Sequence, residues 1–205
     1  MTSSRTATAL ALAAALLVSA APASAAERTA IFAGGCFWCV EADFDKLPGV
    51  TATVSGYIGG TVPNPTYKQV SAGGTGHYEA VEVHYDPAKV SYETLVGYFF
   101  RSVDPLDAGG QFCDRGDSYR TAIFTDGPEQ AKAAQAAKAA AGAELGRKVA
   151  TVISPASTFY AAEDYHQNFY ETNPVRYKYY RFRCGRDQRV QQLWGESAHK
   201  AGPSS

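Results

Sequence analysis

Several common signatures of function are missing from this 205-residue sequence. It has no phosphate-binding G-x-x-x-x-G-K-[ST] loop, no G-x-G-x-x-G fingerprint following a strand, and no G-x-S-x-G nucleophile elbow. Its four histidines show no metal-ligand spacing with one another or with the four cysteines. These absences argue against a P-loop NTPase, a dinucleotide-dependent dehydrogenase, an α/β-hydrolase and a metal site.

Charge is also scarce, since charged residues make up only 19% of the chain and 19 Lys+Arg nearly balance 20 Asp+Glu. No dense cationic stripe precedes a short arginine-rich segment near the C-terminus, so a nucleic-acid partner is not expected. A hydrophobic content of 45% excludes global disorder. The length suits one domain, because domains commonly have about 100–200 residues.

The N-terminus has the pattern of a secretory signal peptide over residues 1–25. A single cation, Arg5, precedes an apolar run at residues 9–17, and small residues follow up to Ala25. The run is shorter than the roughly 20 residues that span a bilayer. We therefore expect cleavage near Ala25, no stable membrane insertion afterwards, and a periplasmic or secreted mature protein. Residues 26–205 then form a single catalytic domain whose cysteines meet an oxidising compartment.

Strand-like and helix-like runs alternate along the mature chain, which predicts a two-layer domain around a central mixed sheet. A tail is expected from about residue 175. The expected strands are residues 29–33, 51–57, 78–85, 120–124 and 149–153, and the expected helices are residues 36–47, 92–103, 128–145 and 160–170.

The sharpest local feature is the sequence Gly35-Cys36-Phe37-Trp38-Cys39, where the first strand is expected to turn into a helix. A thiol in a first helical turn lies near unpaired N–H groups and the positive end of the helix dipole, which favour the nucleophilic thiolate. Phe37 and Trp38 would place aromatic faces beside this sulfur, and such faces suit a small apolar group such as a methyl. The alternative is a buried structural cysteine among aromatic core residues.

Glu79 is a candidate general acid. On the predicted strand it shares a face with Val81, Val83 and Tyr85. If this is the core face, burial would raise the pKa of the carboxyl group and keep it protonated near neutral pH, as a general acid requires. The alternative is a carboxylate at the end of the sheet that faces solvent.

Two further segments carry polar and aromatic side chains that could reach the mouth of a pocket. Residues 112–119 run into a strand and could aim Asp114 and Tyr119 at a pocket, and residues 64–67 could supply the phenol of Tyr67. The chain contains thirteen tyrosines, so a packing role is the alternative for each of these phenols.

Taken together, five blocks of the sequence resemble the A-type peptide-methionine sulfoxide reductases. The blocks follow the order and approximate spacing of that family, and the GCFW sequence with a downstream GHxE is the specific part. They are GCFWC at 35–39, NPTY at 64–67, GHYEAVEVHYDP at 76–87, CDRGDSYRTAIF at 113–124 and AEDYHQNFY at 162–170.

This resemblance implies an α+β fold, namely a two-layer sandwich with a central mixed β-sheet flanked by helices and a ferredoxin-like core. It also implies thiol-dependent reduction of methionine S-sulfoxide, free or in oxidised proteins, to methionine. Such an enzyme repairs oxidatively damaged proteins. The family binds no cofactor or metal and takes electrons from a thioredoxin-like dithiol protein, or from dithiothreitol in vitro.

The resemblance further implies roles for individual residues. The Cys36 thiolate would attack the sulfoxide sulfur while Glu79 donates a proton to the departing oxygen. Cys36 would become a sulfenic acid, which condenses with a second thiol to give an intramolecular disulfide. The remaining matching positions cage the substrate methyl group, bind the sulfoxide oxygen or organise the pocket: Phe37, Trp38, Tyr67, Asp114 and Tyr119.

The cysteine that resolves the sulfenic acid is not fixed by the sequence. Many members of the family carry resolving cysteines in a flexible, glycine-rich tail, which points first to Cys184. The residues that follow Cys184 nevertheless look more helical than flexible. Cys39, in a Cys-x-x-Cys arrangement with Cys36, and Cys113, beside a predicted pocket residue, are the alternatives.

Export affects the choice of reductant, because cytosolic thioredoxin cannot reach an exported enzyme. We therefore expect an exported or membrane-tethered thioredoxin-like partner, and oxidised exported proteins as substrates.

Three other functions are compatible with parts of the sequence. A secreted thioredoxin-like dithiol-disulfide oxidoreductase would use Cys36 and Cys39 and would not require Glu79. A secreted binding domain would hold all four cysteines in permanent disulfides. A cysteine hydrolase would need a histidine partner, for which His77 and His166 are available.

Overall fold

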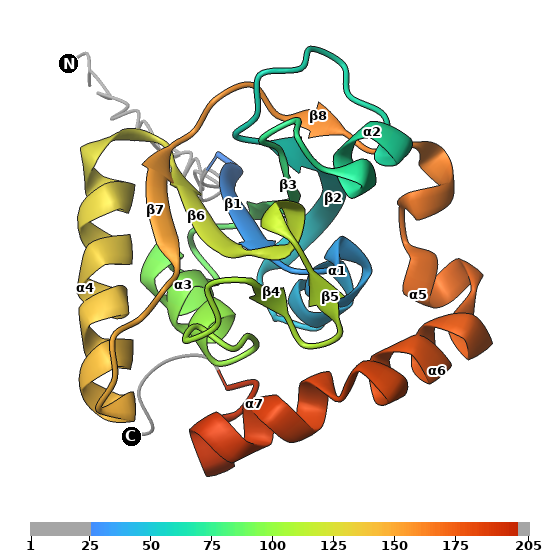
Figure 1. The fold of residues 1–205 in the computed structure, drawn as a ribbon. Coiled ribbons are helices and arrows are strands. Elements are labelled where there is room, and N and C mark those ends of the chain that lie inside the picture. The colour runs from blue at the N-terminus through green and yellow to red at the C-terminus, as the bar shows by residue number, and fades with distance from the viewer. Residues whose placement is uncertain (1–25, 201–205) are drawn as a thin grey trace, which may run out of the picture.

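The computed structural model of the protein describes residues 26–200, so the predicted signal peptide lies outside the described residues (Figure 1). A six-stranded sheet forms the centre, in the order β7-β6-β1-β3-β2-β8. β6 and β7 run parallel, and the other neighbouring pairs are antiparallel, which makes the sheet mixed. Its strands are β1 (Arg28–Gly34), β2 (Val50–Ile58), β3 (Tyr78–Tyr85), β6 (Thr121–Thr125), β7 (Val152–Pro155) and β8 (Tyr160–Ala161).

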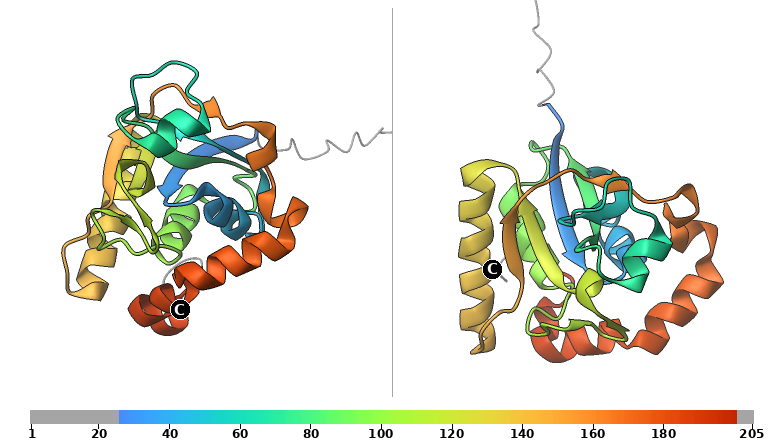
Figure 2. Two further views of the ribbon diagram at one scale, coloured as in Figure 1. Left: turned by 45° about the vertical axis from the view of Figure 1, so that its right-hand side comes forward. Right: turned by 45° about the horizontal axis from the view of Figure 1, so that its top comes forward.

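One face of the sheet packs against the helices α1 (Phe37–Phe44), α3 (Tyr92–Phe100) and α4 (Gly127–Leu145) (Figures 1 and 2). Side chains alternate along β1, so Phe32 enters this core while Ile31 and Ala33 enter a smaller cluster on the opposite face. The ring of Phe32 stacks between Phe44 of α1 at 4.8 Å and Phe99 of α3 at 5.2 Å. The predicted α+β sandwich with a central mixed sheet is confirmed.

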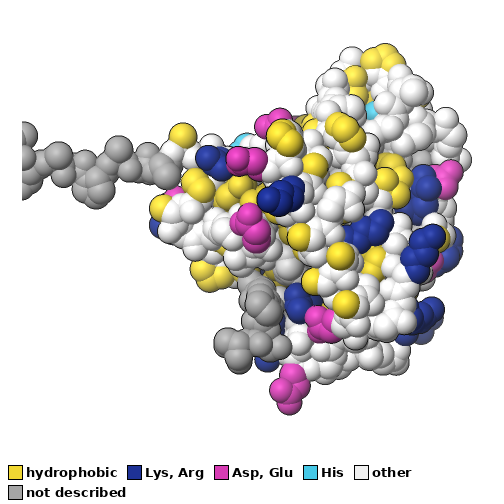
Figure 3. All heavy atoms as spheres, turned by 90° about the vertical axis from the view of Figure 1, so that its left-hand side faces the viewer, with side chains coloured by type: hydrophobic (Ala, Val, Ile, Leu, Met, Phe, Trp, Pro, Cys, Tyr) yellow, Lys and Arg dark blue, Asp and Glu magenta, His cyan; other side chains and the backbone are white. Residues whose placement is uncertain are grey.

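The long helix α4 lies at the periphery of the molecule. Only Ala134 and Ala141 of its nineteen residues are buried. On the α4 side of the molecule, acidic and basic side chains are interspersed with apolar ones (Figure 3). Within residues 26–200, no helix is both long enough and apolar enough to cross a membrane.

The C-terminal segment forms two helices, α6 (Pro174–Cys184) and α7 (Arg186–Trp194), which run below β4 (Gly110–Gln111) and β5 (Asp114–Arg115) (Figure 1). Three buried residues of α7, Arg186, Val190 and Trp194, anchor it to the body of the protein. The helical character that the sequence indicates after Cys184 is therefore present in α7, and α6 makes the preceding part of the expected tail helical as well.

The predicted helix over residues 160–170 is wrong. Tyr160 and Ala161 instead form β8, which pairs with β2 at the edge of the sheet. The side chain of Gln167 connects the turn that follows β8 to β2. Its Oε1 accepts a hydrogen bond from the N–H of Ser55, and its Nε2 donates one to the carbonyl of Ser55, at 2.9 Å each. Asn168 has a left-handed backbone (φ 49°), so α5 (Phe169–Thr172) begins only after it. Long-range pairing with β2 overrides the local helical pattern here.

Two further features of the chain differ from expectation. The strand expected over residues 149–153 is β7, which begins at Val152 and not at residue 149, because Ala150 donates its N–H to the carbonyl of Pro105 at 2.7 Å. The sequence predicts no helix or strand between residues 57 and 78, but the structure has a short helix there, α2 (Tyr67–Ala72). Thr66 caps α2 through reciprocal hydrogen bonds with Gln69, and this cap fixes the position of Tyr67 at the first turn.

Candidate functional site

A small cavity lies where the first turn of α1 meets β3, α2, the 114–119 segment and α6. All seven residues predicted to be catalytic or substrate-binding line it, together with one residue that was not predicted, Tyr180. The lining residues are Cys36, Phe37, Trp38, Tyr67, Glu79, Asp114, Tyr119 and Tyr180.

Cys36 is the N-cap residue of α1, and its carbonyl accepts the first helical hydrogen bonds from Cys39 and Val40. Glu79 approaches the same helix end from β3. Its Oε2 accepts a 3.1 Å hydrogen bond from the backbone N–H of Phe37. A carboxyl group is thus held directly beside the residue that follows the thiol, at the positive end of the helix.

Of the two alternatives that the sequence leaves open for Glu79, the structure shows the core face of the strand and not the solvent-facing one. Glu79 is only 2% exposed, and Val81 and Val83 on the same face are fully buried. Burial raises the pKa of Glu79 to about 8, although the hydrogen bond from Phe37 acts in the opposite direction. The carboxyl group is therefore mainly protonated at neutral pH and can donate a proton to a ligand in the cavity.

The expectation that the helix end favours a Cys36 thiolate is corrected by the structure. Burial raises the pKa of the Cys36 thiol well above its usual range, and the neighbouring Cys39 and Glu79 add to this effect. The nearby Tyr180 hydroxyl acts in the opposite direction and does not offset these effects. Loss of hydration outweighs the partial charge of one short helix, so the thiol is protonated in the unliganded protein.

Aromatic rings form one wall of the cavity. Trp38 stacks on Phe169 with ring centroids 3.7 Å apart and planes tilted by 8°, and Tyr180 meets the indole edge-on at 5.8 Å. Phe37 lies between Tyr57 at 5.9 Å and Tyr67 at 6.5 Å. Phe37 and Trp38 thus line the same cavity as Cys36, which agrees with the aromatic surroundings that the GCFW sequence predicts for this thiol.

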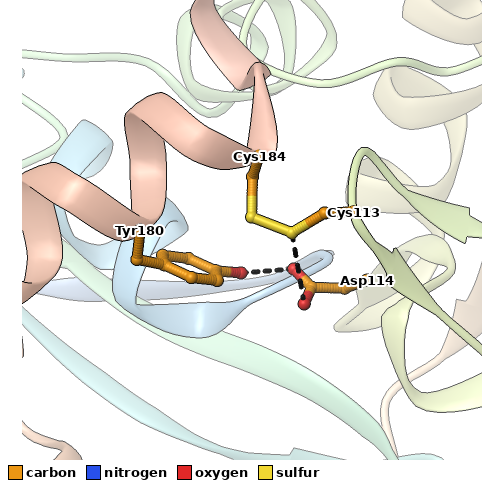
Figure 4. The surroundings of a disulfide bond; sticks show 4 residues. All are labelled: Cys113, Asp114, Tyr180 and Cys184. Carbon is orange, nitrogen blue, oxygen red and sulfur yellow. Dashed lines mark hydrogen bonds between the residues drawn. A yellow bond between two sulfur atoms is a disulfide. The ribbon is translucent and has the colours of Figure 1, made fainter.

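The polar wall is formed by Asp114 and three tyrosines. The hydroxyl of Tyr180 donates a hydrogen bond to Oδ2 of Asp114 (Figure 4). Burial raises the pKa of both Tyr67 and Tyr119, and the nearby Glu79 contributes to each shift. Both phenols therefore stay protonated and are available as hydrogen-bond donors in the cavity.

The four cysteines are divided between two states. Cys36 and Cys39 are free and buried, whereas Cys113 and Cys184 form a disulfide with Cα atoms 4.8 Å apart (Figure 4). Cys113 is exposed, in contrast to the 7% and 2% exposure of Cys36 and Cys39. The structure thus brings two of the three candidate resolving cysteines together, immediately beside the pocket residue Asp114.

Potential metal ligands gather at the same place. Within residues 26–200, ligand atoms of Cys113, Asp114 and Cys184 lie within 4.8 Å of one another. The two sulfur atoms of this group are bonded to each other, and a disulfide sulfur is not the thiolate that binds a metal ion. We therefore assign Cys113 and Cys184 to a disulfide and not to a metal centre.

Three residues of the site were not predicted from the sequence: Tyr180, His166 and Phe169. Phe169 and His166 belong to the AEDYHQNFY block but contact the site only because β8 folds back on β2. Tyr180 lies on α6, one helical turn before Cys184. The position of Tyr180 one helical turn before Cys184 was the one feature of the sequence that could have identified it as a site residue.

The chain matches the model of a family described as peptide methionine sulfoxide reductase over residues 28–198. It is 55% identical over 179 residues to peptide methionine sulfoxide reductase MsrA 2 of Rhizobium meliloti, which covers 87% of this chain and 89% of the relative. It is 50% identical over 184 residues to MsrA 2 of Caulobacter vibrioides, with 88% and 93% covered.

Solved structures agree with these sequence matches. Methionine sulfoxide reductase A of Corynebacterium diphtheriae superposes with a TM-score of 0.70 and 37% identity, covering 73% of this chain and 76% of the other. The reduced form of Mxr1 from Saccharomyces cerevisiae superposes with a TM-score of 0.69 and 31% identity, covering 78% and 91%.

Proposed function

Because the chain belongs to the A-type peptide methionine sulfoxide reductases and is an oxidoreductase acting on methionine sulfoxide, we propose that Cys36 is its nucleophile and Glu79 its general acid. The observation that carries this proposal is the hydrogen bond from Phe37 N–H to Glu79, which holds a buried, protonated carboxyl beside the thiol at the cavity. The aromatic faces of Phe37 and Trp38 cage the methyl group of the substrate. Tyr67 and Tyr119 donate hydrogen bonds to the sulfoxide oxygen, and Asp114 organises the pocket.

The first step transfers the oxygen atom from the substrate to the enzyme. The sulfur of Cys36 attacks the sulfoxide sulfur as Glu79 protonates the oxygen, and the thiol proton of Cys36 compensates for the proton that Glu79 gives. The sum of the step is one thiol plus one sulfoxide giving one Cys36 sulfenic acid plus methionine. The S epimer is the expected substrate, either free or within an oxidised protein.

The second stage returns Cys36 to a thiol. Cys184 attacks the sulfenic sulfur, which releases water and closes a Cys36–Cys184 disulfide. Cys113 then attacks Cys184, which frees the Cys36 thiol and closes the Cys113–Cys184 disulfide. Two features support this order: Cys184 follows the pocket residue Tyr180 by one helical turn, and Cys113 lies within bonding distance of Cys184. Cys39 is the alternative first partner of Cys36.

Electrons enter at the Cys113–Cys184 disulfide. It borders solvent through Cys113, whereas the Cys36 and Cys39 thiols are buried beyond the reach of a protein dithiol. A thioredoxin-like protein is therefore the expected reductant. Mxr1 of Saccharomyces cerevisiae has also been solved in complex with Trx2.

We also propose that residues 1–25 direct the chain out of the cytoplasm, so that its reductant is an exported or membrane-tethered thioredoxin-like protein and its substrates are oxidised exported proteins. Cell fractionation, with sequencing of the mature N-terminus, tests this proposal. A chain that stays cytoplasmic with residue 1 intact would contradict it.

The decisive experiment for the reaction uses the mature protein with dithiothreitol and the separated S and R epimers of methionine sulfoxide, beside a Cys36→Ser control. Turnover of the S epimer alone, absent from the control, is the expected result. Unchanged turnover in the control would rule out the assigned nucleophile. The Glu79→Gln variant distinguishes the dithiol-disulfide oxidoreductase alternative, because disulfide exchange does not need this carboxyl group.

A further inference from the structure

A buried histidine lies behind the pocket wall and has no part in the reaction proposed above. His166 is 2% exposed, and its Nδ1 accepts a 3.1 Å hydrogen bond from the indole Nε1 of Trp38. Its ring centroid lies 4.9 Å from that of Phe37 and 4.5 Å from that of Tyr67. His166 thus contacts three of the side chains that line the cavity.

The hydrogen bond defines the state of the imidazole. An indole N–H can only donate, so Nδ1 of His166 must be unprotonated and the ring proton of the neutral form resides on Nε2. In the described part of the chain, Nε2 has no hydrogen-bond partner. The interaction with Trp38 is therefore the one directional contact of the His166 side chain there.

This contact limits the one motion of Trp38 that stacking leaves open. The nearly parallel stack on Phe169 opposes tilting of the indole, but a stacked ring can still turn within its own plane at little cost. A hydrogen bond at Nε1 fixes the direction in which that edge points. Phe169 and His166 together therefore define the full orientation of the indole plane beside Cys36.

We propose that His166 is a positioning residue, whose Nδ1 fixes the in-plane orientation of Trp38 and thereby fits the aromatic cage to a methyl group. This inference rests on the proposed function, in which Trp38 contacts the substrate methyl. His166 itself does not line the cavity and exchanges no proton with the substrate. It determines substrate fit through Trp38.

Two substitutions separate the hydrogen bond from the space that the ring fills. His166→Asn retains an acceptor, because the Asn Oδ1 occupies a position close to that of Nδ1. His166→Phe retains a ring of similar size but leaves the indole N–H without an acceptor. Both variants are assayed with dithiothreitol against N-acetylmethionine S-sulfoxide and its S-ethyl analogue, and thermal unfolding shows that each is folded.

We expect His166→Phe to raise KM for the methyl substrate about tenfold, the effect of a lost buried hydrogen bond, with a smaller change in kcat. Its preference for methyl over ethyl should fall by a similar factor. His166→Asn should stay within about threefold of wild type on both measures, since the acceptor is retained. Equal impairment of the two variants would show that His166 only fills space, and wild-type behaviour of His166→Phe would show that Trp38 needs no acceptor; either result overturns the proposal.

A double-mutant cycle with Trp38→Phe adds an independent test, because a phenyl ring has no N–H to donate. His166→Phe should have little further effect on KM in the Trp38→Phe background. Additive effects would contradict the proposed link between the two side chains. Failure of the proposed function is distinguishable, because in that case wild type and Cys36→Ser would not differ in sulfoxide turnover.

Discussion

Arg186 reaches from the C-terminal helix α7 to the turn before the nucleophile, where its Nη2 donates a 2.6 Å hydrogen bond to the carbonyl of Gly34. Its Nη1 bonds the carbonyl of Ser102 at 3.0 Å, and the side chain is only 2% exposed. A residue 152 positions along the chain therefore supports the backbone that places Cys36 at the start of α1.

Replacing Arg186 should destabilise the protein and loosen this turn. In Arg186→Met two buried carbonyl groups lose their donor, and we expect the free energy of unfolding to fall by about 2–4 kcal/mol. Arg183→Met, an exposed position on α6, is the matched control and should change it by less than about 0.5 kcal/mol. Denaturant titration measures both. A small effect at Arg186 would mean that α7 does not support the site.

The raised pKa of Glu79 leads us to expect a specific dependence of activity on pH. Its folded-state pKa is about 8, so the proton needed for catalysis is present below that pH and is lost above it. We expect kcat/KM for methionine S-sulfoxide to decline as the pH rises through about 8. Glu79→Gln should lower kcat/KM by about 100-fold or more at pH 7, the usual contribution of a general acid. Full activity of this variant at neutral pH would remove Glu79 from the mechanism.

The raised pKa of Glu41 leads us to expect a specific dependence of stability on pH. It is fully buried on α1, its carboxylate oxygens lack hydrogen-bond partners among residues 26–200, and burial raises its pKa from 4.5 to about 7. The folded protein holds the Glu41 proton more tightly than the unfolded chain does. Protonated Glu41 therefore contributes fully to the free energy of unfolding below about pH 4.5, and this contribution is lost as the pH rises through about 7.

The side chain in Glu41→Gln cannot ionise, so this variant should not lose stability by this route as the pH rises. The free energy of unfolding of the variant relative to wild type is therefore expected to increase between about pH 4.5 and 7 and then to level off. Glu129→Gln, an exposed carboxylate of α4, provides the control for loss of one negative charge. Parallel pH profiles for wild type and Glu41→Gln would contradict the expected titration.

The Cys113–Cys184 disulfide should stabilise the oxidised protein. It links residues 71 positions apart, and a loop of this length corresponds to about 4.4 kcal/mol of chain entropy in the unfolded state. The Cys113→Ser, Cys184→Ser double variant should unfold at lower denaturant than oxidised wild type, but at the same concentration as wild type in excess reductant. A difference that persists in reductant would indicate lost packing and not a lost crosslink.

The same cysteines allow the recycling order to be tested by trapping. Cys113→Ser, treated with one equivalent of methionine S-sulfoxide, should accumulate a Cys36–Cys184 disulfide peptide that mass spectrometry detects. A Cys36–Cys39 peptide in its place would identify Cys39 as the resolving cysteine. The Cys39→Ser variant is the control, since it should still accumulate Cys113–Cys184.

The sequence by itself determined the features that depend on near neighbours in the chain. Residue alternation predicted β3 from end to end and placed Glu79 on the same face as Val81 and Val83. The order of strand, glycine and aromatic residues around Cys36 predicted a helix start with aromatic side chains beside it. These features follow from backbone periodicity and turn chemistry, which act over a few residues.

The tertiary structure decided what depends on distant segments. The pairing of Cys184 with Cys113, the contribution of Tyr180 to the cavity, and the hydrogen bond between His166 and Trp38 join segments 66 to 128 residues apart. The tertiary structure also decided the direction in which the pKa of Cys36 is shifted. Helix position favours the thiolate, but the hydration lost when four other segments close over the Cys36 sulfur has a larger effect on its pKa, and burial is a property of the whole fold.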